Sequence, residues 1–130
     1  MENEKLKITW LGHGSFKIQS PGGKTIYLDP WLTGNPSCPD EYKTVEDCDI
    51  ILLTHGHFDH VGDTVEISKA HKPTLVAQNE LAIWLAGQGV ENASGMNKGG
   101  TQKAGEIKFT MTHAQHSSSA DDNGKPVYLG

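Results

Sequence analysis

The chain has 130 residues, enough for about one domain with a buried hydrophobic core. Its 11 basic and 16 acidic residues give a formal net charge of −5, and lysine and arginine form no cluster, so we expect no nucleic-acid partner. The charged start is unlike a signal peptide, and no apolar run approaches membrane-spanning length. We therefore expect a cytoplasmic protein without a membrane partner, in which Cys38 and Cys48 are free thiols.

The first third of the chain predicts an antiparallel meander followed by a long loop. Strands are expected at 7–11, 16–19 and 25–29, because short apolar stretches there are separated by the glycine-rich and proline-containing turns at 12–14 and 21–23. Trp10 is expected in the core. Residues 30–47 contain three prolines and little periodicity, which is typical of a surface loop that acts as a lid or binds a ligand.

The middle of the chain predicts a βαβ unit. Four consecutive aliphatic residues within 49–54 indicate a strand that is covered on both faces. A helix is expected at 61–71, a strand at 74–77, and a second helix from the capping residue Asn79 to Ala86. This order of elements is that of a parallel βαβ arrangement. A glycine-rich turn region (95–105), a strand (107–111), a polar loop (113–125) and the beginning of another strand (127–130) are expected to follow.

The segment THGHFDH, residues 54–60, places four potential metal ligands in the loop after the buried strand: His55, His57, Asp59 and His60. Ligand sites of open α/β folds lie at this end of the strands. Packing does not explain the cluster, since histidine is only moderately common in cores and a buried aspartate would carry an unpaired charge. Imidazole and carboxylate groups at this density are typical ligands of zinc, manganese or ferrous iron. The alternative is an exposed polar loop in which the histidines occur by chance.

The pattern His55-x-His57-x-Asp59-His60 after an apolar strand resembles the HxHxDH motif of the metallo-β-lactamase superfamily. The stretches TWLGHGSF, YLDPWLTGNP, LTHGHFDHVGDTVEIS and MTHAQHSSS are similar to bacterial and archaeal metal-dependent hydrolases of poorly defined substrate, related to the ascorbate-6-phosphate lactonase type. The resemblance covers nearly the whole chain, although only the central motif is specific. It implies an α/β (α+β) fold, namely the N-terminal half to two-thirds of an αβ/βα sandwich.

The resemblance also implies a first metal bound by His55, His57 and a third histidine after a later strand. Two residues compete for this third position, His113 and His116. The apolar alternation of the strand at 107–111 continues to His113 and predicts that this residue is packed inward. We therefore expect His116 to be the ligand.

The same resemblance assigns roles to residues around a second metal, which Asp59 and His60 would bind. Asp29 matches an acidic residue that holds the metal ligands from behind; its alternative is an aspartate that only begins a turn before proline. His13 is either a substrate contact or an ordinary turn residue. Trp31 opens the long loop and is expected to line the substrate cleft.

These residues imply a metal-dependent hydrolase that acts on a small-molecule ester, lactone or phosphoester. One or two divalent ions are expected, zinc in the first place, with manganese or iron as alternatives. A metal ion lowers the pKa of bound water from about 15.7 toward 7, and Asp59 would orient this water or accept its proton as the catalytic residue. The alternative is a non-catalytic metal-binding fragment or interaction module that lacks the second half of the active site.

The family's second-metal site also uses a bridging aspartate and a distal histidine, and neither has a candidate in this sequence. Asp121 and Asp122 follow His116 too closely, and no histidine comes later. We therefore expect residues 1–130 to form one metallo-β-lactamase-like hydrolase domain that is truncated at the C-terminus. Half a sandwich leaves an apolar sheet face uncovered, which predicts a homo-oligomer in which a second copy covers it.

Overall fold

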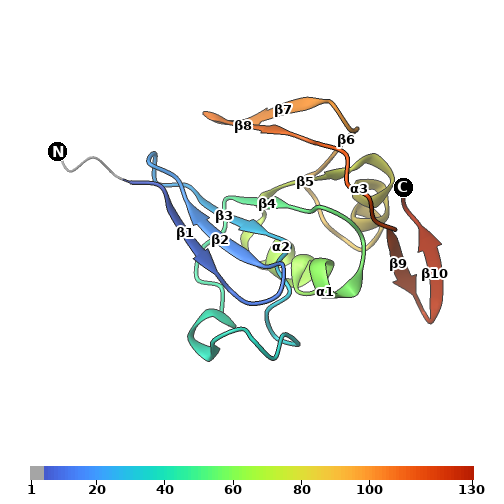
Figure 1. Cartoon of the computed structure of the whole chain (residues 1–130), viewed down its shortest axis with the longest axis horizontal. Helices are drawn as coiled ribbons and strands as arrows, with labels where there is room; N and C mark the ends of the chain where they lie inside the picture. Colours follow the sequence, from blue (N-terminus) through green and yellow to red (C-terminus); the bar gives the residue numbers. More distant parts are fainter. Residues whose placement is uncertain (1–4) are drawn as a thin grey trace.

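A central sheet of six strands, in the order β1 to β6, organises the structure, a computed structural model that describes residues 5–130 (Figure 1). Two further sheets are the two-stranded pairs β7–β8 and β9–β10. The elements are β1 (Lys7–Trp10), β2 (Phe16–Gln19), β3 (Thr25–Leu28), the 3-10 helix η1 (Asp40–Tyr42), β4 (Ile50–Leu52), α1 (Phe58–Val61), α2 (Thr64–His71), β5 (Thr74–Gln78), α3 (Asn79–Gly87), β6 (Ala93–Met96), β7 (Thr101–Ala104), β8 (Ile107–Thr110), β9 (Ser119–Asp122) and β10 (Lys125–Tyr128).

The central sheet changes from antiparallel to parallel at β3. Strands β1, β2 and β3 form the predicted antiparallel meander, whereas β3, β4, β5 and β6 run parallel to one another. Leu28 pairs with Leu52, and Leu52 pairs with Val76, so β3, β4 and β5 end at the same edge of the sheet. The segments that follow these three strands therefore meet at one place, which is where the predicted ligands lie.

One face of the sheet packs against the helices to form the main core. Side chains alternate along each strand, so Tyr27, Ile51 and Leu75 lie on this face with 2% exposure or less. They share a hydrophobic cluster with Ile67 of α2 and Leu81 and Leu85 of α3. The order strand, helices, strand, helix, strand confirms the predicted βαβ arrangement.

The opposite face of the sheet is also apolar, but only part of it is covered. Phe109 of β8 and the following Met111 face Leu28 and Leu52 across a cavity of about 240 Å³. Farther along this face, at the edge strand β1, Ile8 is 60% exposed and Trp10 is 63% exposed. The prediction that Trp10 belongs to the core is therefore wrong, because this residue lies on the face opposite the helices.

Several other local predictions also need correction. The helix predicted at 61–71 corresponds to α2, which begins only at Thr64, because Gly62, with a φ of 20°, separates it from the short helix α1 that ends at Val61. Asn79 does not cap α3; instead the Gln78 side chain accepts a hydrogen bond of 3.1 Å from the Leu81 N–H. The predicted turn region at 95–105 contains β7, and the predicted polar loop at 113–125 contains β9. Strands β7 and β9 are too polar to be recognised locally and are defined by pairing with β8 and β10.

Two general predictions can be compared with the described residues. Cys38 and Cys48 are both buried and free, as expected. Among residues 5–130, none of the helices combines the length and apolar character needed to cross a membrane.

Candidate metal centre

Three histidines meet at the carboxyl edge of the sheet. His55 and His57 follow β4, and their Nε2 and Nδ1 atoms are 3.1 Å apart. The ring of His116, which comes from the loop between β8 and β9, has its centroid 4.8 Å from that of His55 and 5.0 Å from that of His57. Each ring offers one nitrogen, and these three nitrogens all lie within 4.8 Å of one another. The three side chains predicted to bind a first metal are thus close enough to share one ion.

A tight contact between two loops brings His116 to this place. The Gly56 N–H, between the two histidines of the HxH segment, donates a hydrogen bond of 3.1 Å to the Ser118 Oγ. A Cβ atom at position 56 would lie 3.0 Å from the Ser119 carbonyl oxygen, so a side chain there would push the two loops apart by a few tenths of an ångström. The Ser117–Ser119 segment therefore has a structural function next to His116.

His13, Asp59 and His60 form a second group of potential ligands. Asp59 and His60 lie in the short helix α1, whereas His13 lies in the turn between β1 and β2. The His13 Nε2 is 2.8 Å from the Asp59 Oδ2, and the His13 and His60 rings have centroids 5.1 Å apart. One ligand atom from each of the three lies within 4.8 Å of the other two. The two groups are adjacent, since the His55 and His60 ring centroids are 4.1 Å apart.

Asp29 links the two groups of potential ligands, because it contacts His60 directly and His55 through Thr54. This residue follows β3, is 2% exposed and has a φ of 47°, an uncommon backbone conformation for a non-glycine residue. Its carboxylate accepts hydrogen bonds from the Thr54 N–H at 2.8 Å and the Thr54 hydroxyl at 2.5 Å, and lies 2.8 Å from the His60 Nδ1. The Thr54 Oγ1 is also 2.8 Å from the His55 Nδ1. A single buried carboxylate thereby positions a histidine of each group.

Asp29 also begins a turn before Pro30, which was the alternative role predicted for this residue. Its carbonyl accepts hydrogen bonds from the Trp31 N–H at 2.8 Å and from the Ser15 hydroxyl at 2.6 Å. The turn and the contact with His60 therefore occur together in one residue.

The pKa of His55 favours a neutral imidazole, and the pKa of Asp59 favours an ionised carboxylate. Burial, and then the neighbouring His60, His57 and His116, lower the pKa of His55 to about 4, so its ring is neutral near pH 7 and has a lone pair to share. Burial acts to raise the pKa of Asp59, but its own backbone N–H and the His60 and His13 rings bring the pKa below its usual value. Burial raises the pKa of Asp29 despite its hydrogen bonds to Thr54 and His60.

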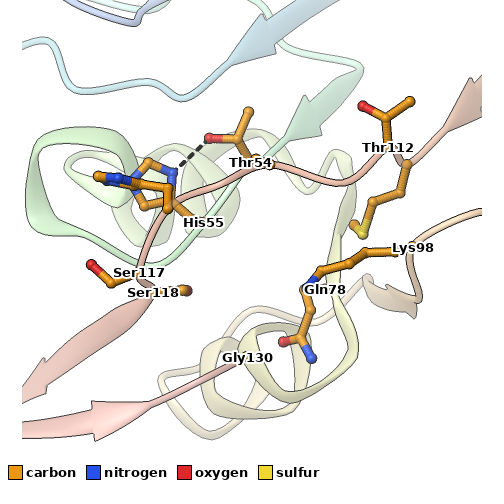
Figure 2. Close-up of a pocket in the computed structure, with 11 residues that line it drawn as sticks. Thr54, His55, Gln78, Lys98, Thr112, Ser117, Ser118 and Gly130 are labelled. Atoms are coloured by element: carbon orange, nitrogen blue, oxygen red, sulfur yellow. Dashed lines mark hydrogen bonds between the residues drawn. The ribbon is translucent and has the colours of Figure 1, made fainter.

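A cavity of about 230 Å³ opens beside the first group of histidines (Figure 2). His55, His116, Ser117 and Ser118 line it on the side of the metal ligands, and Gln78 and Lys98 lie across from His55. The residues that line it do not include Trp31. Trp31 is partly buried and contacts the His13 ring edge-on at 5.5 Å between centroids, and Phe58 at 5.9 Å, so it borders the second group instead.

Three residues of this region were not identified from the sequence, and the burial of a fourth was predicted wrongly. Thr54 was not singled out, although it directly precedes the histidine motif, and Gln78 and Lys98 carry no motif that would mark them. His113 is exposed, contrary to the prediction that it is packed. The reason is that β8 ends at Thr110, so the alternation of its side chains does not extend to this residue.

A parallel sheet with neighbouring groups of histidines and carboxylates at its carboxyl edge defines an α/β protein with a candidate metal centre. The sequence pattern of a family described as "Beta-lactamase superfamily domain" matches residues 7–127. The chain belongs to the metallo-β-lactamase superfamily, as the motif predicted.

Curated relatives carry names that refer to a metal. The chain is 51% identical to a protein of Koribacter versatilis named UPF0173 metal-dependent hydrolase, over all of this chain and 56% of that protein. It is also 51% identical to a metal-dependent hydrolase of Roseiflexus castenholzii, over 95% of this chain and 52% of that protein. The chain thus spans about half the length of these relatives.

Solved structures support the predicted fold class. Igni18, described as a novel metallo hydrolase of the archaeon Ignicoccus hospitalis, matches with a TM-score of 0.76 and 32% identity, over 87% of this chain and 50% of that one. The subclass B3 metallo-β-lactamase MEM-A1 from a soil metagenome library matches with a TM-score of 0.55 and 19% identity, over 95% of this chain and 61% of that one, and this likeness concerns the fold alone. The predicted α/β metallo-β-lactamase-type fold is therefore confirmed.

Proposed function

We propose that the chain is the metal-binding part of a hydrolase that uses metal-activated water on an ester, lactone or phosphoester. The observation that carries this proposal is the convergence of His55, His57 and His116, from two distant segments, beside Asp59 and an open cavity. The names of the curated relatives support the same reaction class. The substrate would be a small molecule, since the cavity holds only about 230 Å³.

The chemistry of the donor atoms fits a divalent cation. Three imidazoles, of which His55 is neutral near pH 7, are a typical set of protein ligands for a catalytic zinc ion, whose fourth position is taken by water or substrate. We propose zinc as the first choice, with manganese or iron as alternatives, because the same ligands serve several first-row metals. When bound, such an ion supplies Lewis acidity that activates water and polarises the oxygen of the scissile group.

In this proposal Asp59 is the catalytic residue that handles the proton. Its lowered pKa keeps the carboxylate ionised near pH 7, so that Asp59 can orient the attacking water and accept its proton. Asp29 orients the ring of His60. When the His60 Nδ1–H donates to Asp29, the lone pair of the His60 Nε2 points away from the carboxylate and can bind a cation. Thr54 fixes the ring of His55 through its hydroxyl.

Lys98 is the feature of the cavity that bears on the substrate. Lys98 is the one lysine among the described residues that line the cavity, and it lies across the cavity from His55 (Figure 2). An ammonium group at this place would attract a carboxylate or phosphate group of the substrate. We expect Lys98→Gln to raise the KM for anionic substrates and to leave kcat nearly unchanged.

The test is a hydrolysis screen on esters, lactones and phosphodiesters with the metal-loaded chain. The proposal predicts turnover of at least one class that a chelator abolishes, that added metal restores and that His57→Ala lacks. Asp59→Asn should retain the first metal but lose most of the turnover. Metal binding with no turnover of any class would instead support the alternative, a non-catalytic metal-binding module.

We also propose a cytoplasmic location and self-association. Two buried free thiols agree with a reducing compartment.

The exposed Ile8 and Trp10 extend an apolar sheet face of the kind that pairs with a partner, and a second copy of this chain is the partner we propose.

A further inference from the structure

The turn between β1 and β2 is built to hold one histidine against the candidate metal centre. His13 has a φ of 52°, a left-handed conformation that non-glycine residues adopt infrequently. Such backbone strain persists only where the surrounding structure enforces it, and it is concentrated at functional sites. The Nε2 of this residue lies 2.8 Å from the Asp59 Oδ2.

Three side chains contact this turn and hold His13 in its left-handed conformation. The buried Asn35 side chain donates to the Gly12 carbonyl at 3.1 Å, and the Trp10 indole donates to the His13 carbonyl at 2.9 Å. The Trp31 ring packs edge-on against the His13 ring. The turn also lies very close to His60, since a Cβ atom at position 14 would be 2.8 Å from the His60 Cε1.

The donor set around His13 matches the requirement of a metal ion. One ligand atom of each of His13, Asp59 and His60 lies within 4.8 Å of the other two, which gives two imidazole nitrogens and one carboxylate oxygen. This group shares no residue with the group of His55, His57 and His116. Mixed imidazole and carboxylate ligands are typical of zinc, manganese and iron.

We propose that His13 is the third protein ligand of a second divalent metal ion, together with Asp59 and His60. This inference rests on the proposed function, because the second ion would lie beside the first.

The simplest competing role for His13 is to position Asp59 through the hydrogen bond between them. The two roles differ in what glutamine can replace. The amide of His13→Gln can still donate to the Asp59 carboxylate, but a neutral amide is a poor ligand for zinc compared with imidazole. A ligand role therefore predicts that His13→Ala and His13→Gln are equally defective, whereas a positioning role predicts that His13→Gln is largely normal.

The experiment titrates the metal-free chain with Zn²⁺ by calorimetry and with Co²⁺ by its visible absorption, and needs no measurement of activity. The expected result is about two equivalents for the unchanged chain and about one for both His13 variants. The control is His113→Ala, which removes an exposed histidine outside all the ligand groups and should keep about two equivalents.

Each other outcome overturns a defined part of the account. One equivalent in the unchanged chain, lost in His57→Ala, would leave the first site standing and reject the second. Two equivalents in His13→Gln, or in both His13 variants, would reject His13 as a ligand. No binding in any variant would reject the proposed function together with this inference.

Discussion

The Asp29 carboxylate lies 2.8 Å from the His60 Nδ1 while it also accepts both polar hydrogens of Thr54. A buried residue after β3 thereby fixes a potential ligand in α1 and, through Thr54, a second one after β4. Removing a residue that hydrogen-bonds a metal ligand typically lowers metal affinity by about 10–100-fold. This relationship leads to the first prediction.

We expect Asp29→Asn to lower the affinity for metal by about 10–100-fold, because the amide cannot accept all three hydrogen bonds. The affinity is measured by competition with a chromophoric chelator. Asp49→Asn is the matched control, since Asp49 also accepts a backbone N–H, from Thr25, but contacts Lys24 instead of a histidine. Equal losses of affinity in the two variants would indicate a general effect on folding and contradict the prediction.

A second pair of variants tests the choice between two neighbouring histidines. His116→Ala should lower the affinity of the first site by more than the roughly 10–100-fold expected for an indirect partner, because a ligand itself is removed. His113→Ala should bind metal normally. The same titration with Zn²⁺ measures both, and a larger loss in His113→Ala would show that the wrong histidine has been chosen.

The pKa of His55 predicts how the metal-free chain responds to acid. Its folded-state value of about 4 lies below its ordinary value of 6.5, so the unfolded chain binds the proton first between these pH values. The stability contribution is fully present above pH 6.5 and is lost as the pH falls toward 4. We expect the Tm of the metal-free chain to fall over this window.

The matched variant for this measurement is His55→Gln, in which the fall of Tm between pH 6.5 and 4 should be shallower. Asp29, whose pKa is raised by burial, contributes with the opposite sign in both proteins, so the comparison isolates the histidine. Identical Tm profiles in the two proteins would be evidence against a lowered pKa of His55.

Gly14 provides a test of the close approach between the β1–β2 turn and His60. In Gly14→Ala the new methyl group would meet the His60 ring at 2.8 Å, so the ring or the turn must move. We expect at least about a tenfold loss of affinity at the second site and a smaller effect at the first. Gly87→Ala is the control, because a Cβ atom there meets no atom within 4 Å. Normal binding of two ions by Gly14→Ala would mean that the turn is not needed at this distance.

The sequence was sufficient to predict the parts of the molecule that depend on local pattern. The aliphatic run at 50–53, the periodicity around it and the dense HxHxDH segment all lie within a short stretch, so the βαβ unit and the ligands after β4 could be identified. Long-range contacts other than the approach of His116 to His55 and His57 escaped prediction. The placement of His13 depends on hydrogen bonds such as that from Asn35 to Gly12, and strands β7 and β9 depend on pairing that their polar composition does not indicate.

The partly open sheet face allows a direct test of self-association. Ile8 and Ile83 are similarly exposed, at 60% and 64%, but Ile8 lies on the sheet face opposite the helices and Ile83 lies on α3. Ile8→Lys should shift the chain from dimer to monomer in sedimentation at micromolar concentration, and Ile83→Lys should not. A monomeric unchanged chain would rule out the proposed second copy.

The most direct test of the whole account is the metal content of the purified chain, measured by elemental analysis beside His57→Ala. We predict at least about one equivalent of a first-row divalent metal in the unchanged chain and a loss of the first-site metal in the variant. Finding no metal in either protein, even after incubation with zinc, manganese and iron, would contradict a functional metal centre in this chain.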